Sequence, residues 1–139
     1  MSRNTFRATV LALSLALVAA ATAACAQQTA PPGGKFQKVS ALVALPDFLP
    51  GMGTLYVDPQ TIPAGPFLAY DRDGKLVSSI YMIPLKDFEA HKAFSNLGAA
   101  KEKVDHVDLY YNAGHPGVAE PHYHIVVWYV SSEKAASLK

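Results

Sequence analysis

Four of the five histidines in this sequence fall within a window of 19 residues that ends at His124. His122 and His124 are two positions apart, so both side chains project from the same side if this segment is an extended strand. His115 lies on the preceding glycine- and proline-rich stretch and could fold over to become a third ligand. Neutral imidazole binds zinc, copper, nickel and iron well, so His115, His122 and His124 are candidate ligands for a divalent transition-metal ion.

Three further side chains could support such a metal site, namely His106, Asp108 and Glu120. A carboxylate could bind the ion directly, or it could accept a hydrogen bond from a ligating histidine and so fix which ring nitrogen carries the proton. With one coordination position left open, the ion would lower the pKa of a bound water and could support hydrolytic or oxygen chemistry.

A purely structural role for the histidines is the alternative interpretation. His-x-His is a common spacing, and beside Tyr110, Tyr111 and Tyr123 the rings could hydrogen-bond across a sheet edge and to loop carbonyls. No Gly-x-Ser-x-Gly motif for nucleophilic catalysis occurs in the sequence. Two functions therefore stay open: a non-enzymatic binding or self-assembling module, or a metal-dependent enzyme that uses the three candidate ligands.

The segment that carries His122 and His124 is predicted to be a strand over residues 121–130. Its alternation places Val126 and Trp128 on the histidine side, while apolar residues also occupy the other side. A strand that is apolar on both faces is expected at the centre of a sheet.

The residues before this strand predict a partner strand and a long connection. Residues 104–111 alternate so that Val107, Leu109 and Tyr111 share one face, which predicts a half-buried strand. The connection over residues 112–120 is longer than a hairpin needs. We therefore predict that it packs on the histidine side and forms the rim of the site.

The rest of the chain indicates several strands joined by short links. Residues 54–58 predict a strand, and residues 66–70 and 75–83 predict a hairpin around the Asp71–Gly74 turn. Residues 85–97 predict a helix that ends at Gly98. The expected fold is one small α+β domain, mainly an antiparallel sheet with one short helix.

Residues 1–26 have the features of a bacterial signal peptide. Arg3 and Arg7 precede an uncharged, apolar stretch, as in a secretion signal. Two processing routes are open, because residues 24–26 form an Ala-x-Ala cleavage site while residues 22–25 resemble a lipobox ending in Cys25. We expect an exported protein, either periplasmic or anchored to a membrane only as a lipoprotein through a lipidated Cys25.

Composition sets the domain boundaries and excludes some partners. Residues 27–35 are rich in proline and glycine and predict a flexible linker, which leaves residues 36–139 as the domain. Without Arg3 and Arg7, ten basic residues face 11 acidic ones, a net charge of −1 that offers no basic surface for nucleic acid. An apolar loop at residues 45–53 and a free sheet edge favour a homo-oligomer.

Two motifs resemble the signature of a bacterial family of small exported proteins with a domain of unknown function: Gly114-His115-Pro116-Gly117-Val118 and Pro121-His122-Tyr123-His124. Residues 51–59, 70–74 and 81–84 are similar to that family as well. Its pattern has aspartate where His124 stands, a histidine where Val126 stands and another where Leu55 stands. The resemblance implies an exported, oligomeric, β-rich domain, and it implies no reaction, substrate or cofactor.

Overall fold

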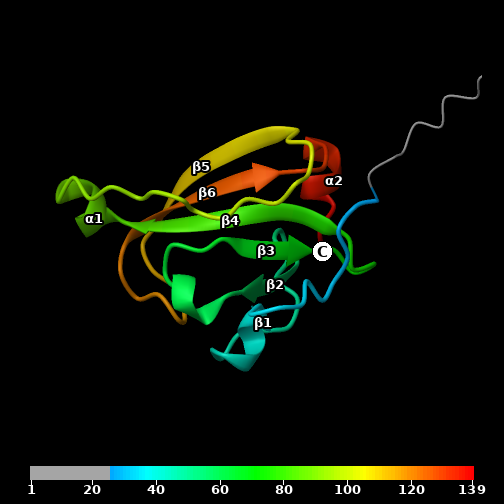
Figure 1. Cartoon of the computed structure of the whole chain (residues 1–139), viewed down its shortest axis with the longest axis horizontal. Coiled ribbons are helices and arrows are strands. Elements are labelled where there is room, and N and C mark those ends of the chain that lie inside the picture. The colour runs from blue at the N-terminus through cyan, green and yellow to red at the C-terminus, as the bar shows by residue number, and fades with distance from the viewer. Residues whose placement is uncertain (1–25) are drawn as a thin grey trace, which may run out of the picture.

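Six strands form one antiparallel sheet within residues 26–139, the part of the chain that the computed structural model describes (Figure 1). The strand order is β1-β2-β3-β4-β6-β5. In chain order the elements are β1 (Gln37–Lys38), the 3-10 turn η1 (Val39–Ala41), β2 (Thr54–Val57), η2 (Pro59–Thr61), β3 (Phe67–Tyr70), β4 (Leu76–Pro84), α1 (Leu85–Glu89), β5 (His106–Asn112), β6 (His122–Trp128) and α2 (Ser132–Ala136). The predicted α+β class is confirmed.

Two elements predicted from the sequence, the central strand and the hairpin, are present in the structure. β6 lies between β4 and β5, so the prediction of a central strand is confirmed. β3 and β4 form the predicted hairpin, and the carboxylate of Asp71 accepts from the backbone N–H groups of Asp73 and Lys75 at 3.0 and 2.9 Å. Gly74 has a φ of 71°, the left-handed conformation that glycine adopts easily.

The sheet buries its two faces under different parts of the chain. On the face that carries His122 and His124, the core is closed by residues from the 39–52 segment, by Val118 and by Leu138. On the opposite face, a smaller cluster around Leu68 is covered by the N-terminal segment and residues near position 100. Among the described residues, no helix is long and apolar enough to cross a membrane.

The N-terminal segment differs from the predicted flexible linker. The N–H of Ala30 donates to the carbonyl of Gly74 at 2.8 Å, and the N–H of Leu76 donates to the carbonyl of Gln28 at 2.9 Å. Composition could not reveal this contact, because the partners are backbone groups at the turn of the distant β3–β4 hairpin. The cleavage sites and Cys25 lie outside the described residues, apart from Ala26.

The helical content also differs from the prediction. α1 ends at Glu89 instead of continuing to residue 97, and His91 and Asn96 adopt φ angles of 54° and 56°, which no α-helix contains. Phe88 is exposed, so this segment lacks the buried apolar face that stabilises a short helix. α2 was not predicted. It begins after Ser131, whose hydroxyl accepts from the N–H of Lys134 at 3.3 Å.

β5 forms as predicted, but its apolar face is exposed to solvent. The exposed fractions of Val107, Leu109 and Tyr111 are 55%, 63% and 52%. β5 is the last strand of the sheet, and residues 26–139 leave this row of side chains uncovered.

Candidate metal centre

The loop between β5 and β6 directs His115 back over β6. His115 and Val118 exchange two backbone hydrogen bonds of 2.9 Å, with Pro116 and Gly117 between them. Gly117 has a φ of 89°, and proline followed by such a glycine is typical of a type II turn. At Gly114 any side chain would meet the carbonyl oxygen of Ala119 at 2.6 Å, so glycine permits the close approach. The predicted packing of this loop on the histidine side is confirmed.

The structure brings His115, His122 and His124 together. Each offers one ring nitrogen, and the three nitrogens lie within 4.8 Å of one another. They therefore lie within about 3 Å of a shared centre, farther than the zinc–nitrogen bond length of about 2 Å, so the rings would move inward to bind an ion. His122 and His124 are buried, with exposed fractions of 0% and 2%, and His115 is half-buried on the loop.

Backbone carbonyls fix the proton positions of two of these rings. Nδ1 of His122 lies 2.6 Å from the carbonyl oxygen of Glu120, and Nδ1 of His115 lies 3.0 Å from that of Pro116. A carbonyl can only accept, so each Nδ1 carries the proton and donates it. In the neutral tautomer that this bond selects, Nε2 carries the lone pair, the form that binds a metal ion.

His124 completes the set and can take either of two tautomers. Its Nε2 lies 2.9 Å from Nε2 of His122, and its Nδ1 lies 2.9 Å from the hydroxyl of Tyr110. With the proton on Nε2, His124 donates to His122 and accepts from Tyr110. With the proton on Nδ1, it donates to Tyr110 and presents a third lone pair to the shared centre.

Burial favours the neutral form of His124. Burial lowers the pKa of this imidazole to about 4, and the neighbouring His122 and His115 act in the same direction. Because a metal ion competes with protons for imidazole, a histidine that stays neutral at ordinary pH is ready to bind one.

Of the predicted supporting residues, two are bonded elsewhere. Nδ1 of His106 lies 2.8 Å from the carboxylate of Asp105, and Asp108 accepts from the indole N–H of Trp128 at 2.8 Å. Glu120 supports the site only through its backbone carbonyl, because its carboxylate pairs with Lys86.

Tyr110 supports the site through its hydroxyl, and the sequence alone named it only as one of three tyrosines that could hydrogen-bond to the histidines. The register pairs Tyr110 with His124 across β5 and β6. A symmetric hairpin centred on Gly117 gives this same register, and that symmetry is the signal that could have found it.

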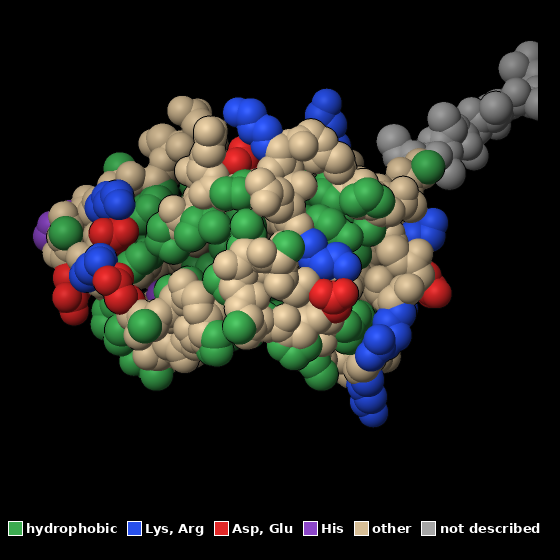
Figure 2. All heavy atoms as spheres, turned by 90° about the horizontal axis from the view of Figure 1, so that it is seen from below, with side chains coloured by type: hydrophobic (Ala, Val, Ile, Leu, Met, Phe, Trp, Pro, Cys, Tyr) green, Lys and Arg blue, Asp and Glu red, His purple; other side chains and the backbone are tan. Residues whose placement is uncertain are grey.

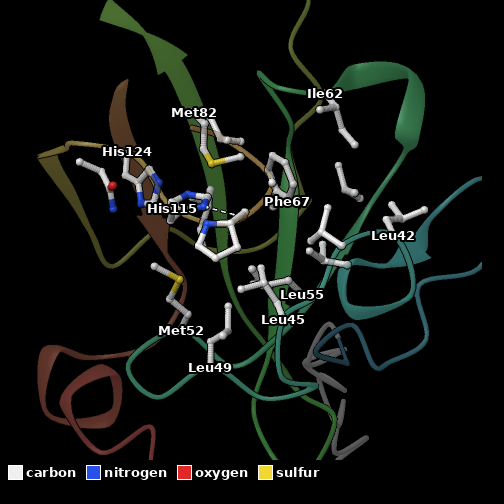
Figure 3. Close-up of a pocket in the computed structure, with 18 of the residues that line it drawn as sticks. Leu42, Leu45, Leu49, Met52, Leu55, Ile62, Phe67, Met82, His115 and His124 are labelled. Carbon is white, nitrogen blue, oxygen red and sulfur yellow. Dashed lines mark hydrogen bonds between the residues drawn. The ribbon is translucent and has the colours of Figure 1, made fainter. Parts of the chain in front are cut away.

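An apolar pocket of about 330 Å³ adjoins the histidines. In the close-up of Figure 3, His115 and His124 lie together on one side, and Leu42 and Ile62 lie on the other. The lining comes from η1 and the loop after it, from the strands β2 to β4 and from the β5–β6 loop. The apolar loop at residues 45–53 was predictable from the sequence, but its position over a pocket beside the histidines was not.

The chain matches no family model and no curated protein. Among solved structures, it is similar to the crystal structure of the hypothetical protein TTHB210 from Thermus thermophilus. The two are 46% identical, with a TM-score of 0.61, over 68% of this chain and 87% of that one. This chain belongs to the TTHB210 family.

Membership in the TTHB210 family supports the fold and supplies no activity. Three neutral nitrogen ligands match the protein ligands of catalytic zinc sites, which keep a fourth position for water or another molecule. In this TTHB210-family chain, His115 and His124 also line the apolar pocket, so the fourth position would adjoin it.

Proposed function

We propose that this protein binds a divalent transition-metal ion through His115, His122 and His124 and acts as a metal-dependent binding module outside the cytoplasm. The observation that carries the proposal is the convergence of the ring nitrogens within 4.8 Å. Two of the rings are already oriented by backbone carbonyls. Hydrogen bonds within the described residues satisfy His122 and His124, whereas Nε2 of the half-buried His115 has no hydrogen-bond partner among them and is free to bind an ion.

Binding is a better description than catalysis because the pocket offers little acid–base chemistry. Among the described residues that line it, His115 and His124 are the titratable ones, and both serve as proposed metal ligands. A metal-dependent enzyme with the same three ligands is the alternative, in which a metal-bound water would have to supply the reactivity.

Export rests on the signal peptide predicted from residues 1–26. The intact mass of the product recovered from the cell envelope tests it. A chain that begins at Gln27 would indicate a free periplasmic protein, and a diacylated chain that begins at Cys25 would indicate a lipoprotein. A full-length chain in the cytoplasm would contradict export.

Metal analysis of the purified protein tests the metal site. We expect one zinc or cobalt ion per chain after loading and removal of excess metal. His115→Ala should lower the affinity at least about 100-fold, since one of three protein ligands is lost while the buried core stays intact. His106→Ala is the matched control, because His106 lies in the same hairpin but bonds to Asp105.

Two results would contradict the metal site. One is wild-type protein that retains no stoichiometric metal after loading. The other is His115→Ala protein that binds zinc as tightly as the His106→Ala control. Either result would leave the histidines as structural hydrogen-bonding groups.

A second function, self-association, is favoured by the open face of β5. Val107, Leu109 and Tyr111 form a continuous apolar row with Tyr123, Ile125 and Val127, their register partners on β6. Figure 2 shows that hydrophobic side chains also cover much of the molecular surface seen from below. Exposed apolar rows on an edge strand are usually covered by another chain.

Light scattering tests the self-association. We propose that the wild-type protein forms a homo-oligomer and that Leu109→Asp shifts it to a monomer. Val104→Asp is the control, because Val104 is also exposed and precedes the strand. A wild-type monomer at high concentration would contradict this function.

A further inference from the structure

We infer that the pocket beside the three histidines binds a small carboxylate with an apolar body, whose carboxylate head ligates the metal ion. The inference rests on the proposed metal site and goes beyond it by naming the ligand class. Four features of the pocket support the inference: the composition of its lining, its volume, its single polar end and its opening to solvent.

The pocket is apolar everywhere except at the histidine end. Its polar side chains are those of Asn112, His115 and His124, and the other lining side chains are aliphatic, aromatic, methionine or proline. Met52 and Met82 lie on the side of the pocket that the histidines occupy (Figure 3). Methionine side chains adapt to ligands of different shape, so this wall tolerates more than one apolar body.

The volume limits the size of the ligand. An apolar cavity of about 150 Å³ in a protein accommodates one benzene molecule. The pocket here measures about 330 Å³, roughly twice that volume, so it has room for roughly 12 non-hydrogen atoms. A carboxylate with about ten carbons fits this limit.

Charge selects the head group. Three neutral imidazoles leave the two positive charges of the ion uncompensated, and no carboxylate of residues 26–139 lines the pocket. An uncompensated charge in an apolar site is unfavourable, so an anionic oxygen ligand is preferred at the open position. The Oδ1 atom of Asn112 accepts from the N–H of Gly114 at 2.8 Å, which leaves its amide N–H groups as donors to such an anion.

The end of the pocket away from the histidines reaches the surface. Leu42 and Ile62 line the pocket and have exposed fractions of 38% and 45%. In Figure 3 they lie on the side opposite His115 and His124. A ligand with its head at the ion would therefore place its tail along the apolar walls toward this opening.

Decanoate is the probe that tests the inference, with acetate and decylammonium as controls. Calorimetry of the zinc-loaded protein should show decanoate binding at least tenfold tighter than acetate or decylammonium. Removal of the zinc should weaken decanoate binding at least tenfold, because the head then loses its ligand. In cobalt-loaded protein, decanoate should change the visible absorption bands of the ion, whereas decylammonium should not.

A pair of surface variants tests the position of the apolar body. Leu42→Asp places a charge in the wall near the opening and should weaken decanoate binding at least tenfold. Leu97→Asp is the matched control, because Leu97 has the same exposed fraction of 38% but does not line the pocket. Zinc affinity should be the same in both variants.

The outcomes separate this inference from the proposed function. Stoichiometric zinc without decanoate binding overturns the inference and leaves the metal site intact. Equal binding of decanoate and decylammonium, or no change in the cobalt spectrum, also overturns it, since the head would not touch the ion. A protein that binds no metal contradicts the proposed function, and decanoate bound by such a protein contradicts the inference as well.

Discussion

On each face of the β5–β6 hairpin, some side chains depart from the usual distribution of buried apolar and exposed polar residues. On one face His122 and His124 are buried, and Met82 of β4 lies directly opposite His124. On the other face Leu109 pairs with Ile125 and is largely exposed. The same two strands therefore bury polar rings and expose aliphatic side chains.

Hydrophobic burial alone does not explain this arrangement. Burial of Val126 and Trp128 favours the observed side of β6, but it favours neither the burial of two imidazoles beside them nor the exposure of Leu109. Buried polar groups persist where they are fully hydrogen-bonded or have a ligand, and exposed apolar rows persist where another surface covers them. The buried face therefore matches the proposed metal site, and the exposed face matches the proposed self-association surface.

Truncation of one residue on each face should show the largest difference. Met82→Ala removes buried contacts and leaves a cavity, so we expect a loss of about 2 to 5 kcal/mol in the free energy of unfolding. Leu109→Ala should change it by less than about 0.5 kcal/mol when the protein is monomeric. Urea unfolding at low protein concentration measures both values. An equal loss in the two variants would mean that the β5 face is covered within the single chain.

The buried face should also make the metal-free protein sensitive to acid. The pKa of His124 is lowered to about 4, below its ordinary value of 6.5, so the unfolded chain binds this proton more readily than the folded chain. Above about pH 6.5 His124 is neutral in both states and does not reduce the stability. As the pH falls toward 4, the free energy of unfolding decreases by on the order of 3 kcal/mol.

Thermal unfolding across this pH range, in the presence of a chelator, measures the effect. His124→Gln should flatten the curve between pH 6.5 and 4, and His106→Gln should retain it. A curve that is unchanged in His124→Gln would show that another group titrates in this window.

Removal of the Tyr110 hydroxyl should weaken the metal site without removing a ligand. In the metal-binding tautomer, Nδ1 of His124 donates to this hydroxyl, and its loss leaves a donor unpaired. We expect Tyr110→Phe to lower zinc affinity about 10- to 100-fold, as for other groups that orient a ligand. Tyr111→Phe, on the opposite face, is the control for competition titrations. Equal affinities in the two variants would exclude a role for Tyr110.

The smallest effect is expected from the carboxylate of Glu120. Only its backbone carbonyl contacts His122, and the carboxylate forms an exposed ion pair with Lys86. Glu120→Gln should therefore change zinc affinity by less than about twofold. A larger loss in the same titration would place the carboxylate at the ion, as the sequence alone had suggested.

The sequence by itself determined the local geometry of the site. Strand alternation placed His122 and His124 on one side of β6, and Pro116 with Gly117 set the turn that returns His115 to them. The Asp71–Gly74 turn and the central position of β6 were also predictable. These features depend on residues close together in the chain, whose conformations follow from local sterics and from the two-residue period of a strand.

Only the tertiary structure decided which side of each strand is buried. A period of two groups side chains by face, but the elements that pack on a face decide which one meets water. For this reason three features could not be predicted from the sequence. These are the exposed apolar side chains of β5, the pocket formed by the 39–52 segment, and the hydrogen bonds that hold the N-terminal segment to the β3–β4 hairpin. α1 is short for the same reason: a helix of this length needs a buried apolar face, and the fold provides none beyond Glu89.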